Sequence, residues 1–210
     1  MKYLKNLVTT EVTIKKSRFI TILEPIASDS DILPIIQRLK KEYPKATHYC
    51  YAYLIGDNAQ FGGSNDDGEP AGTAGVPMLE VLKQNNVTNI LAVVIRYYGG
   101  IHLGAGGLIR AYSGGVADAI KEATFYTLIK ATLFELHFNY DQIGDVEYLL
   151  QDEEIVEKEY LKDVVYKVAI TNLEAFDKIK HHFFEIKKLE ETLLAINLKQ
   201  WYNKVGHMSY

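Results

Sequence analysis

The 210-residue sequence has one cysteine, Cys50, and no uninterrupted apolar run near the roughly 18 residues that a membrane span needs. One cysteine excludes an internal disulfide and a metal site built from cysteines. The first residues carry lysines but no apolar segment followed by a small-residue cleavage site, so we find no secretion signal. These absences predict a protein of the cytoplasm that has no membrane partner.

The chain also lacks an excess of positive charge. Residues 1–125 carry 13 Lys and Arg against 12 Asp and Glu, whereas residues 126–210 carry 10 against 15. Neither half is polybasic, so the sequence does not predict nonspecific nucleic-acid binding driven by counterion release. Recognition of phosphate would require a discrete site.

Two small domains suit the length, and 48% hydrophobic residues exclude a disordered chain. We place the boundary between residues 125 and 126, where the order of elements and the charge both change. The sequence pattern of residues 126–210 predicts the order strand–helix–strand–strand–helix–strand, which is ferredoxin-like. The fold class is therefore α+β.

In the first part, two β-branched runs, Thr9–Ile14 and Arg18–Leu23, predict a hairpin. His48–Ile55 predicts a strand with aromatic side chains on one face. The apolar run Ile90–Ile95 predicts a central strand buried on both faces. Between them, residues 61–75 are rich in glycine and acids without apolar periodicity, which predicts a loop.

The segment Ser64–Gly75 places three carboxylates within four positions. Like charges so close repel one another, and a cation, an arginine or a Mg²⁺ ion would relieve the repulsion. The alternative is an exposed turn whose aspartates cap the helix beginning near Ala74. Both interpretations stay open. The acids are candidate metal ligands, and the candidate binding residues are Ser64, Asp66, Asp67, Glu69 and Thr73.

The segment Arg96–Tyr112 leaves the buried strand, crosses a glycine loop and enters a helix, whose free N–H groups and dipole attract anions. It is neither a Walker loop nor a dinucleotide fingerprint, because Ile109 replaces the third glycine of the latter. The candidate binding residues are Arg96, His102, Gly104, Gly106 and Arg110. We expect the charged residues of both segments to share one concave surface.

Close packing of the helix against the sheet is the alternative explanation of these glycines. We assign packing to Gly114 and Gly115, since a glycine within a helix costs about 1 kcal/mol relative to alanine. His48 is expected to be structural and Cys50 to be a buried core thiol. No serine stands in a nucleophile elbow, so the sequence shows no serine-based catalytic set.

Three strings, HYCYAYLIG, SNDDGEPAGTAGVPMLEVL and VVIRYYGGIHLGAGGLIRAYSGGV, resemble the IMPACT family and specifically its bacterial YigZ-type members. The resemblance covers about residues 16–123. Asn65 stands where the family usually has serine, and Tyr49 varies within the His-x-Cys element. The second part resembles the small acidic C-terminal domain of the bacterial members, with a less specific signal.

The resemblance implies a first domain similar to the second domain of small-subunit ribosomal protein number five, an α/β sandwich. The same fold occurs in elongation factor G and in galactokinase-type kinases, and the C-terminal domain resembles the last domain of elongation factor G. Eukaryotic relatives control translation initiation by competing for an activator of a starvation-sensing kinase. The implied fold hosts both binding proteins and enzymes, so it does not decide the function.

Three function classes therefore compete. The resemblance favours a translation-associated regulatory or binding protein that recognises RNA, the ribosome or a translation factor through a glycine-rich groove of the first domain. The second class is an enzyme or sensor for a phosphorylated small molecule, with Arg96 and Arg110 holding phosphate and the acids holding Mg²⁺ or accepting a proton. The third is a protein-interaction module. No cofactor is required, and whether a reaction is catalysed stays open.

Overall fold

The computed structural model describes residues 1–197. The chain divides into two compact units, the first ending at Tyr126 and the second beginning at Thr127. This division lies one residue from the boundary that the sequence suggested. The tail Trp201–Tyr210, in which the sequence has no clear pattern, lies outside the described residues.

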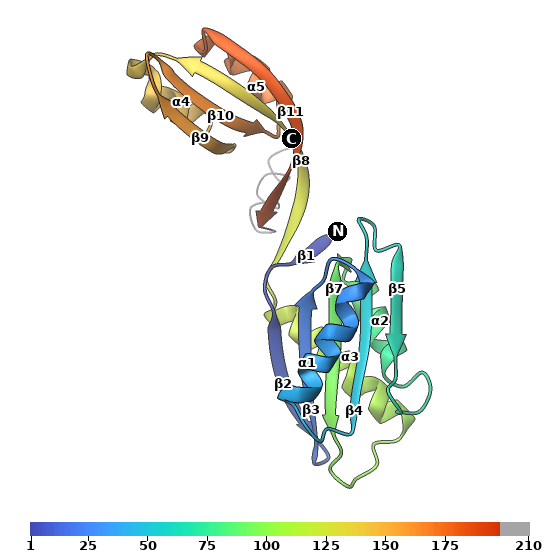
Figure 1. Ribbon diagram of the computed structural model, residues 1–210. Coiled ribbons are helices and arrows are strands. Elements are labelled where there is room, and N and C mark those ends of the chain that lie inside the picture. The colour runs from blue at the N-terminus through green and yellow to red at the C-terminus, as the bar shows by residue number, and fades with distance from the viewer. Residues whose placement is uncertain (198–210) are drawn as a thin grey trace. The chain divides into compact units, whose positions relative to one another are not determined.

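A five-stranded antiparallel sheet forms the centre of the first unit (Figure 1). Its central strand is the apolar one, with residues 90–96 all buried, as the sequence predicted. The hairpin prediction is also confirmed, since Ile14 pairs with Ser17 across a two-residue turn. In spatial order the strands are β2 (Val8–Ile14), β3 (Ser17–Pro25), β7 (Ile90–Tyr97), β4 (His48–Ile55) and β5 (Phe61–Asn65).

Helices cover both faces of this sheet (Figure 1). On one face lies α1 (Ile32–Glu42), which buries Ile36 and Leu39 in one apolar cluster with residues of β3 and β7. On the other face lie α2 (Gly75–Gln84) and α3 (Ala105–Glu122), which contact each other and the strands beneath them. The burial of both sheet faces explains the unbroken apolar run of β7.

Part of the predicted loop is wrong, because Phe61–Asn65 forms β5 and pairs with β4. Two glycines hide the strand in the sequence, since they remove the alternation of apolar and polar residues. They also lie close to side chains of the neighbouring strand. A Cβ on Gly62 would lie 2.8 Å from Leu54 Cδ2, and one on Gly63 would lie 2.8 Å from the Tyr53 ring.

Packing explains one of the two helical glycines and not the other. A Cβ on Gly115 would lie 2.6 Å from Thr21 Oγ1, so only glycine lets α3 approach β3 there. A Cβ on Gly114 would meet no atom within 4 Å, so the packing interpretation is wrong at this position. The glycines of the second segment predict a loop over Gly99–Gly107, but this loop ends earlier, since Gly106 and Gly107 already belong to α3.

The first unit also contains short strand pairings outside its five-stranded sheet. The strand β1 (Lys2–Leu4) pairs in parallel with β6 (Val87–Thr88) and antiparallel with the first residues of β8 (Phe125–Phe138). The sequence patterns did not predict β1 or β6, which are too short to show a period.

The second unit has the predicted ferredoxin-like element order. Its strands lie in the order β11-β8-β10-β9, and its helices share a core with buried residues of β8 and β10. The α+β fold class is therefore confirmed. No helix among residues 1–197 is long and apolar enough to cross a membrane. The elements after β8 are α4 (Ile143–Leu149), β9 (Glu154–Tyr160), β10 (Val164–Ile170), α5 (Leu173–Ile179) and β11 (Glu185–Asn197).

Candidate functional site

The carboxylate of Asp66 holds the loop between β5 and α2. Its Oδ1 accepts hydrogen bonds from the backbone N–H groups of Ala74 and Gly75 at 3.0 and 2.8 Å, and its Oδ2 accepts one from Gly72 at 2.8 Å. Burial acts to raise the pKa of Asp66, but the three N–H donors outweigh burial and hold the pKa below its ordinary value. Asp66 thus has the capping role that the sequence left open, at the start of α2.

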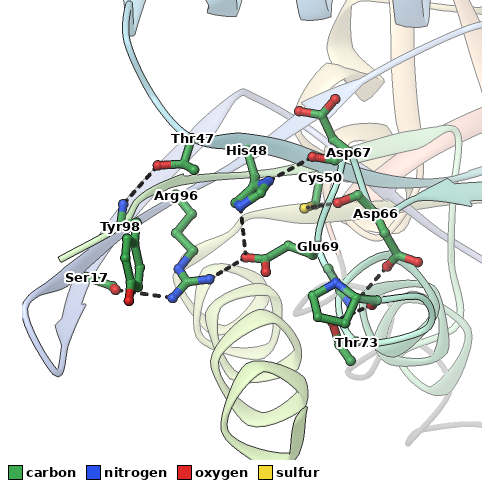
Figure 2. Close-up of polar contacts among 12 residues, drawn as sticks. Ser17, Thr47, His48, Cys50, Asp66, Asp67, Glu69, Thr73, Arg96 and Tyr98 are labelled. Atoms are coloured by element: carbon green, nitrogen blue, oxygen red, sulfur yellow. Dashed lines mark hydrogen bonds and ion pairs between the residues drawn. The ribbon is translucent and has the colours of Figure 1, made fainter. Parts of the chain in front are cut away.

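Asp67 fastens the same loop to β4 from a left-handed backbone conformation, with φ of 39°. Its carboxylate accepts the backbone N–H of Tyr49 at 2.7 Å, and its own N–H donates to Asn65 Oδ1 at 2.7 Å. Its carbonyl oxygen faces Nδ1 of His48 at 2.8 Å (Figure 2). Because a carbonyl only accepts, His48 carries a proton on Nδ1.

Glu69 and Arg96 form a buried ion pair that joins the two glycine-rich segments (Figure 2). Arg96 Nη1 lies 2.6 Å from Glu69 Oε1, and the side chains are 5% and 3% exposed. The hydroxyl of Tyr112, on α3, donates to the same carboxylate oxygen at 2.7 Å. Burial is the main cause that raises the pKa of the Tyr112 hydroxyl, so it remains a donor. Removing either charge would leave the other buried and unpaired.

The guanidinium of Arg96 also organises the loop that follows β7. Its Nη2 donates to Ser17 Oγ at 3.3 Å, and the same oxygen accepts the N–H of Gly99 at 3.2 Å. The rings of Phe19 and Tyr98 each lie 5.3 Å from the guanidinium carbon, at distances typical of cation–π contacts. Its Nε is buried and has no hydrogen-bond partner among residues 1–197.

His48 and Cys50 complete the cluster from β4. Nε2 of His48 lies 3.9 Å from Glu69 Oε1, too far for a hydrogen bond. The thiol of Cys50 is buried and donates to the carbonyl of Asp66 at 2.9 Å. Burial is the main cause that raises the pKa of Cys50 to about 12, so this thiol is protonated and unreactive at neutral pH. The core-thiol prediction is confirmed.

The remaining candidates of the second segment face outward. His102 is exposed, and its ring centroid lies 5.7 Å from that of Tyr98. Gly104 precedes α3 with φ of 74°, and within residues 1–197 no side chain caps the N–H groups of the first helical turn. Arg110 is exposed and has no hydrogen bond or ion pair among the described residues. Its Nη1 lies 3.6 Å from the place of a Cβ on Gly106.

The structure thus brings only some predicted residues together. Glu69 and Arg96 meet directly, Asp66 and Asp67 bind backbone N–H groups, and His102 and Arg110 face solvent. Ser64 is exposed on β5, and the hydroxyl of Thr73 donates to the carbonyl of Pro70 at 2.6 Å. No group of three His, Cys, Asp or Glu suited to a metal ion occurs within residues 1–197. Ligand binding by any of these residues remains a prediction.

Sequence reasoning missed two members of the buried cluster and one contact of a third. Ser17 and Tyr112 carry no motif, and Ser17 lies 79 positions before Arg96. His48 was expected to be structural, and its Nδ1 contact agrees, but its other nitrogen faces Glu69. The alternation of β4 was the available signal, since it places His48 and Cys50 on the same face of the strand.

Comparisons with known proteins agree with this architecture. The family model described as the Impact N-terminal domain matches residues 15–120. The chain is 42% identical to the IMPACT family member YigZ of Escherichia coli over 167 residues, which cover 78% of this chain and 82% of that protein. It is 40% identical to the IMPACT family member YvyE of Bacillus subtilis over 166 residues, covering 78% and 76%.

A solved structure described as that of a hypothetical protein covers 90% of this chain and 96% of its own. Its TM-score is 0.59 at 37% identity, so the likeness includes the fold and the sequence. The family model spans half of the chain, and the bacterial relatives match most of their length. The chain therefore belongs to the IMPACT family.

Proposed function

We propose that this chain is a translation-associated regulatory or binding protein that acts through the outer surface of its two glycine-rich segments. Membership of the IMPACT family supports the link to translation, because the resemblance implies that eukaryotic relatives control initiation. Binding to the ribosome, to RNA or to a translation factor is the finer part of the proposal.

The Glu69–Arg96 ion pair is the observation that favours binding over catalysis. An enzyme acting on a phosphorylated molecule would need free acids for Mg²⁺ or a proton and a free arginine for phosphate. Here one acid neutralises the arginine, and the two aspartates accept backbone N–H groups. These residues hold the loops in place, and the loop surfaces remain free for a partner.

A small phosphate-bearing ligand is the second candidate, and one feature favours it. Arg110 lies over the first turn of α3, whose N–H groups have no side-chain cap from the described part of the chain. An arginine there opposes the helix dipole unless an anion is present. A nucleotide or sugar phosphate would supply that charge without any role for the buried ion pair.

Sedimentation with ribosomal subunits tests the first candidate. The full chain, mixed with subunits at low salt, should move with them through a sucrose gradient. Arg110→Gln should weaken this association. The control Arg38→Gln should not, because it changes an arginine of α1 that is already paired with Glu24 and Glu42. A chain that stays at the top of the gradient, but whose thermal midpoint rises with a small phosphate ligand, would replace the first candidate by the second.

A further inference from the structure

Four cations surround one end of the first unit, where β3 and β4 begin and β7 ends. The backbone of Lys16 is so close to Gly99 that a Cβ there would lie 2.1 Å from the Lys16 carbonyl. On the other side, Tyr98 N–H donates to Thr47 Oγ1 at 3.1 Å, which places the segment after α1 beside the same loop. Figure 1 shows the hairpin turn, the start of β4 and the start of α3 at this end. We call Lys15, Lys16, Lys45 and Arg110 the basic rim.

The basic rim carries charge that its own surroundings do not neutralise. All four side chains are exposed and have no ion pair among residues 1–197. The nearby acids are occupied, since Asp66 and Asp67 bind backbone N–H groups and Glu69 pairs with Arg96. The small net charge of the first unit therefore does not mean that its charges are evenly mixed. At this end the acids bind groups within the unit, and the cations of the basic rim face solvent.

The backbone at the three rim lysines is an independent sign of function. Lys15, Lys16 and Lys45 have φ of 45°, 64° and 64°, in the left-handed region that glycine and asparagine occupy at lower cost. Two-residue hairpin turns of this kind favour Asn-Gly. Lysine at all three positions places positive charge on the turns at the expense of backbone strain, and such strain is concentrated at functional sites in proteins.

An exposed aromatic ring stands beside the rim. The Tyr98 side chain is held from one side by the buried Arg96 guanidinium, and the residue is 42% exposed. The ring of His102 lies next to it. A fixed aromatic ring with a solvent-facing side, flanked by unpaired cations, fits a polymer that carries both phosphates and unpaired bases.

We infer that this end of the first unit binds single-stranded RNA, with phosphates against the basic rim and a base stacked on Tyr98. RNA, rather than another polyanion with bases, follows from the proposed function, on which this inference rests. A single strand is required because a duplex keeps its bases stacked on one another and offers none to the Tyr98 ring.

Fluorescence anisotropy of the full chain with a labelled oligoribonucleotide of about 12 nucleotides tests the inference. Binding should weaken as salt rises from about 50 to about 200 mM. The triple variant Lys15→Gln, Lys16→Gln, Lys45→Gln should reduce the slope of log affinity against log salt by about 2, because each lost phosphate contact removes about 0.7. The matched control Lys5→Gln, Lys162→Gln, Lys178→Gln removes three exposed lysines elsewhere and should leave the slope unchanged.

Tyr98→Ala should weaken RNA binding about 5- to 150-fold, whereas Tyr98→Phe, which keeps the ring, should preserve it. The inference is overturned if wild type does not bind at low salt, if the two lysine variants behave alike, or if polyphosphate competes as well as RNA and Tyr98→Ala has no effect. Sedimentation of wild type with ribosomal subunits separates the two claims. Subunit binding without binding to the oligoribonucleotide keeps the proposed function and refutes this site, while RNA binding without subunit binding does the reverse.

Discussion

In the segment Ser64–Gly75 every carboxylate accepts a hydrogen bond from within the first unit, whereas in Arg96–Tyr112 both His102 and Arg110 face solvent. Both segments are rich in glycine and carry charged side chains, yet the first uses its charges for internal contacts, whereas the second exposes His102 and Arg110. The ion pair between Glu69 and Arg96 is the point at which they meet. A charged side chain in a glycine-rich loop therefore indicates a binding function only when the structure shows whether it faces the interior or the solvent.

The buried ion pair should give the largest effect on stability. Arg96→Ala leaves the Glu69 carboxylate buried without its partner, so the free energy of unfolding should fall by about 3–5 kcal/mol. Arg38→Ala, which removes a surface ion-pair partner, should cost about 0–1 kcal/mol. Urea denaturation of both variants measures the difference. Equal losses would show that the Glu69–Arg96 pair is no more important than a surface pair.

The double variant Arg96→Met with Glu69→Leu sharpens this test. It removes both charges and replaces them by apolar side chains of similar length, so it should recover most of the loss seen in Arg96→Ala. If the double variant is as unstable as Arg96→Ala, the loss comes from packing of the Arg96 side chain against Phe19 and Tyr98. The Glu69–Arg96 charge pair would then not be what distinguishes the two segments.

Two neighbouring glycines of α3 should respond in opposite directions. Gly115→Ala forces a Cβ against Thr21 in the core and should destabilise the first unit by about 1–3 kcal/mol. Gly114→Ala meets open space and should stabilise the helix by up to about 1 kcal/mol. Thermal midpoints of the two variants provide the measurement. A loss at Gly114 would contradict the open space around this position.

Asp66→Ala should cost about 0.5–2 kcal/mol, the usual range for loss of a helix cap. Because the folded state lowers the pKa of Asp66, its contribution is complete above the ordinary value of 3.8 and is lost as the pH falls through the lower, folded-state pKa. The gap between wild type and variant should thus be full at pH 7 and shrink in acid. The exposed Asp57, changed to alanine, is the control, and a gap that grows in acid would contradict the capping role.

Local patterns sufficed for much of the fold. Two β-branched runs identified the β2–β3 hairpin, and the unbroken apolar run identified β7 as central. Asn172 is of a residue type that favours helix starts, and its side chain accepts the N–H of Ala175 at the start of α5. The strand Phe61–Asn65 was not predicted, because its glycines pack closely against the side chains of Tyr53 and Leu54 on the neighbouring strand. A pattern along one strand gives no information about such contacts between strands.

The site was less predictable, because its contacts are long-range. One sequence cannot tell which of Asp66, Asp67 and Glu69 reaches Arg96, since all three carry the same charge at nearly the same distance along the chain. The choice follows from where each carboxylate sits once β4 and β5 pair. Tyr112 was named only as the end of a segment, yet its hydroxyl completes the Glu69 environment.

Arg110→Ala should give the smallest effect on stability and the largest contrast with Arg96→Ala. Arg110 is exposed and unpaired among residues 1–197, so its loss should change the free energy of unfolding by less than about 0.5 kcal/mol. A small gain is expected at low salt, because the side chain reaches back over Gly106, where its charge opposes the dipole of α3. Thermal melting with and without sulfate completes the test. An anion bound at this helix start should raise the midpoint of wild type and leave that of Arg110→Ala unchanged. A large loss in Arg110→Ala without any sulfate effect would make this arginine part of the scaffold, and the second segment would then resemble the first.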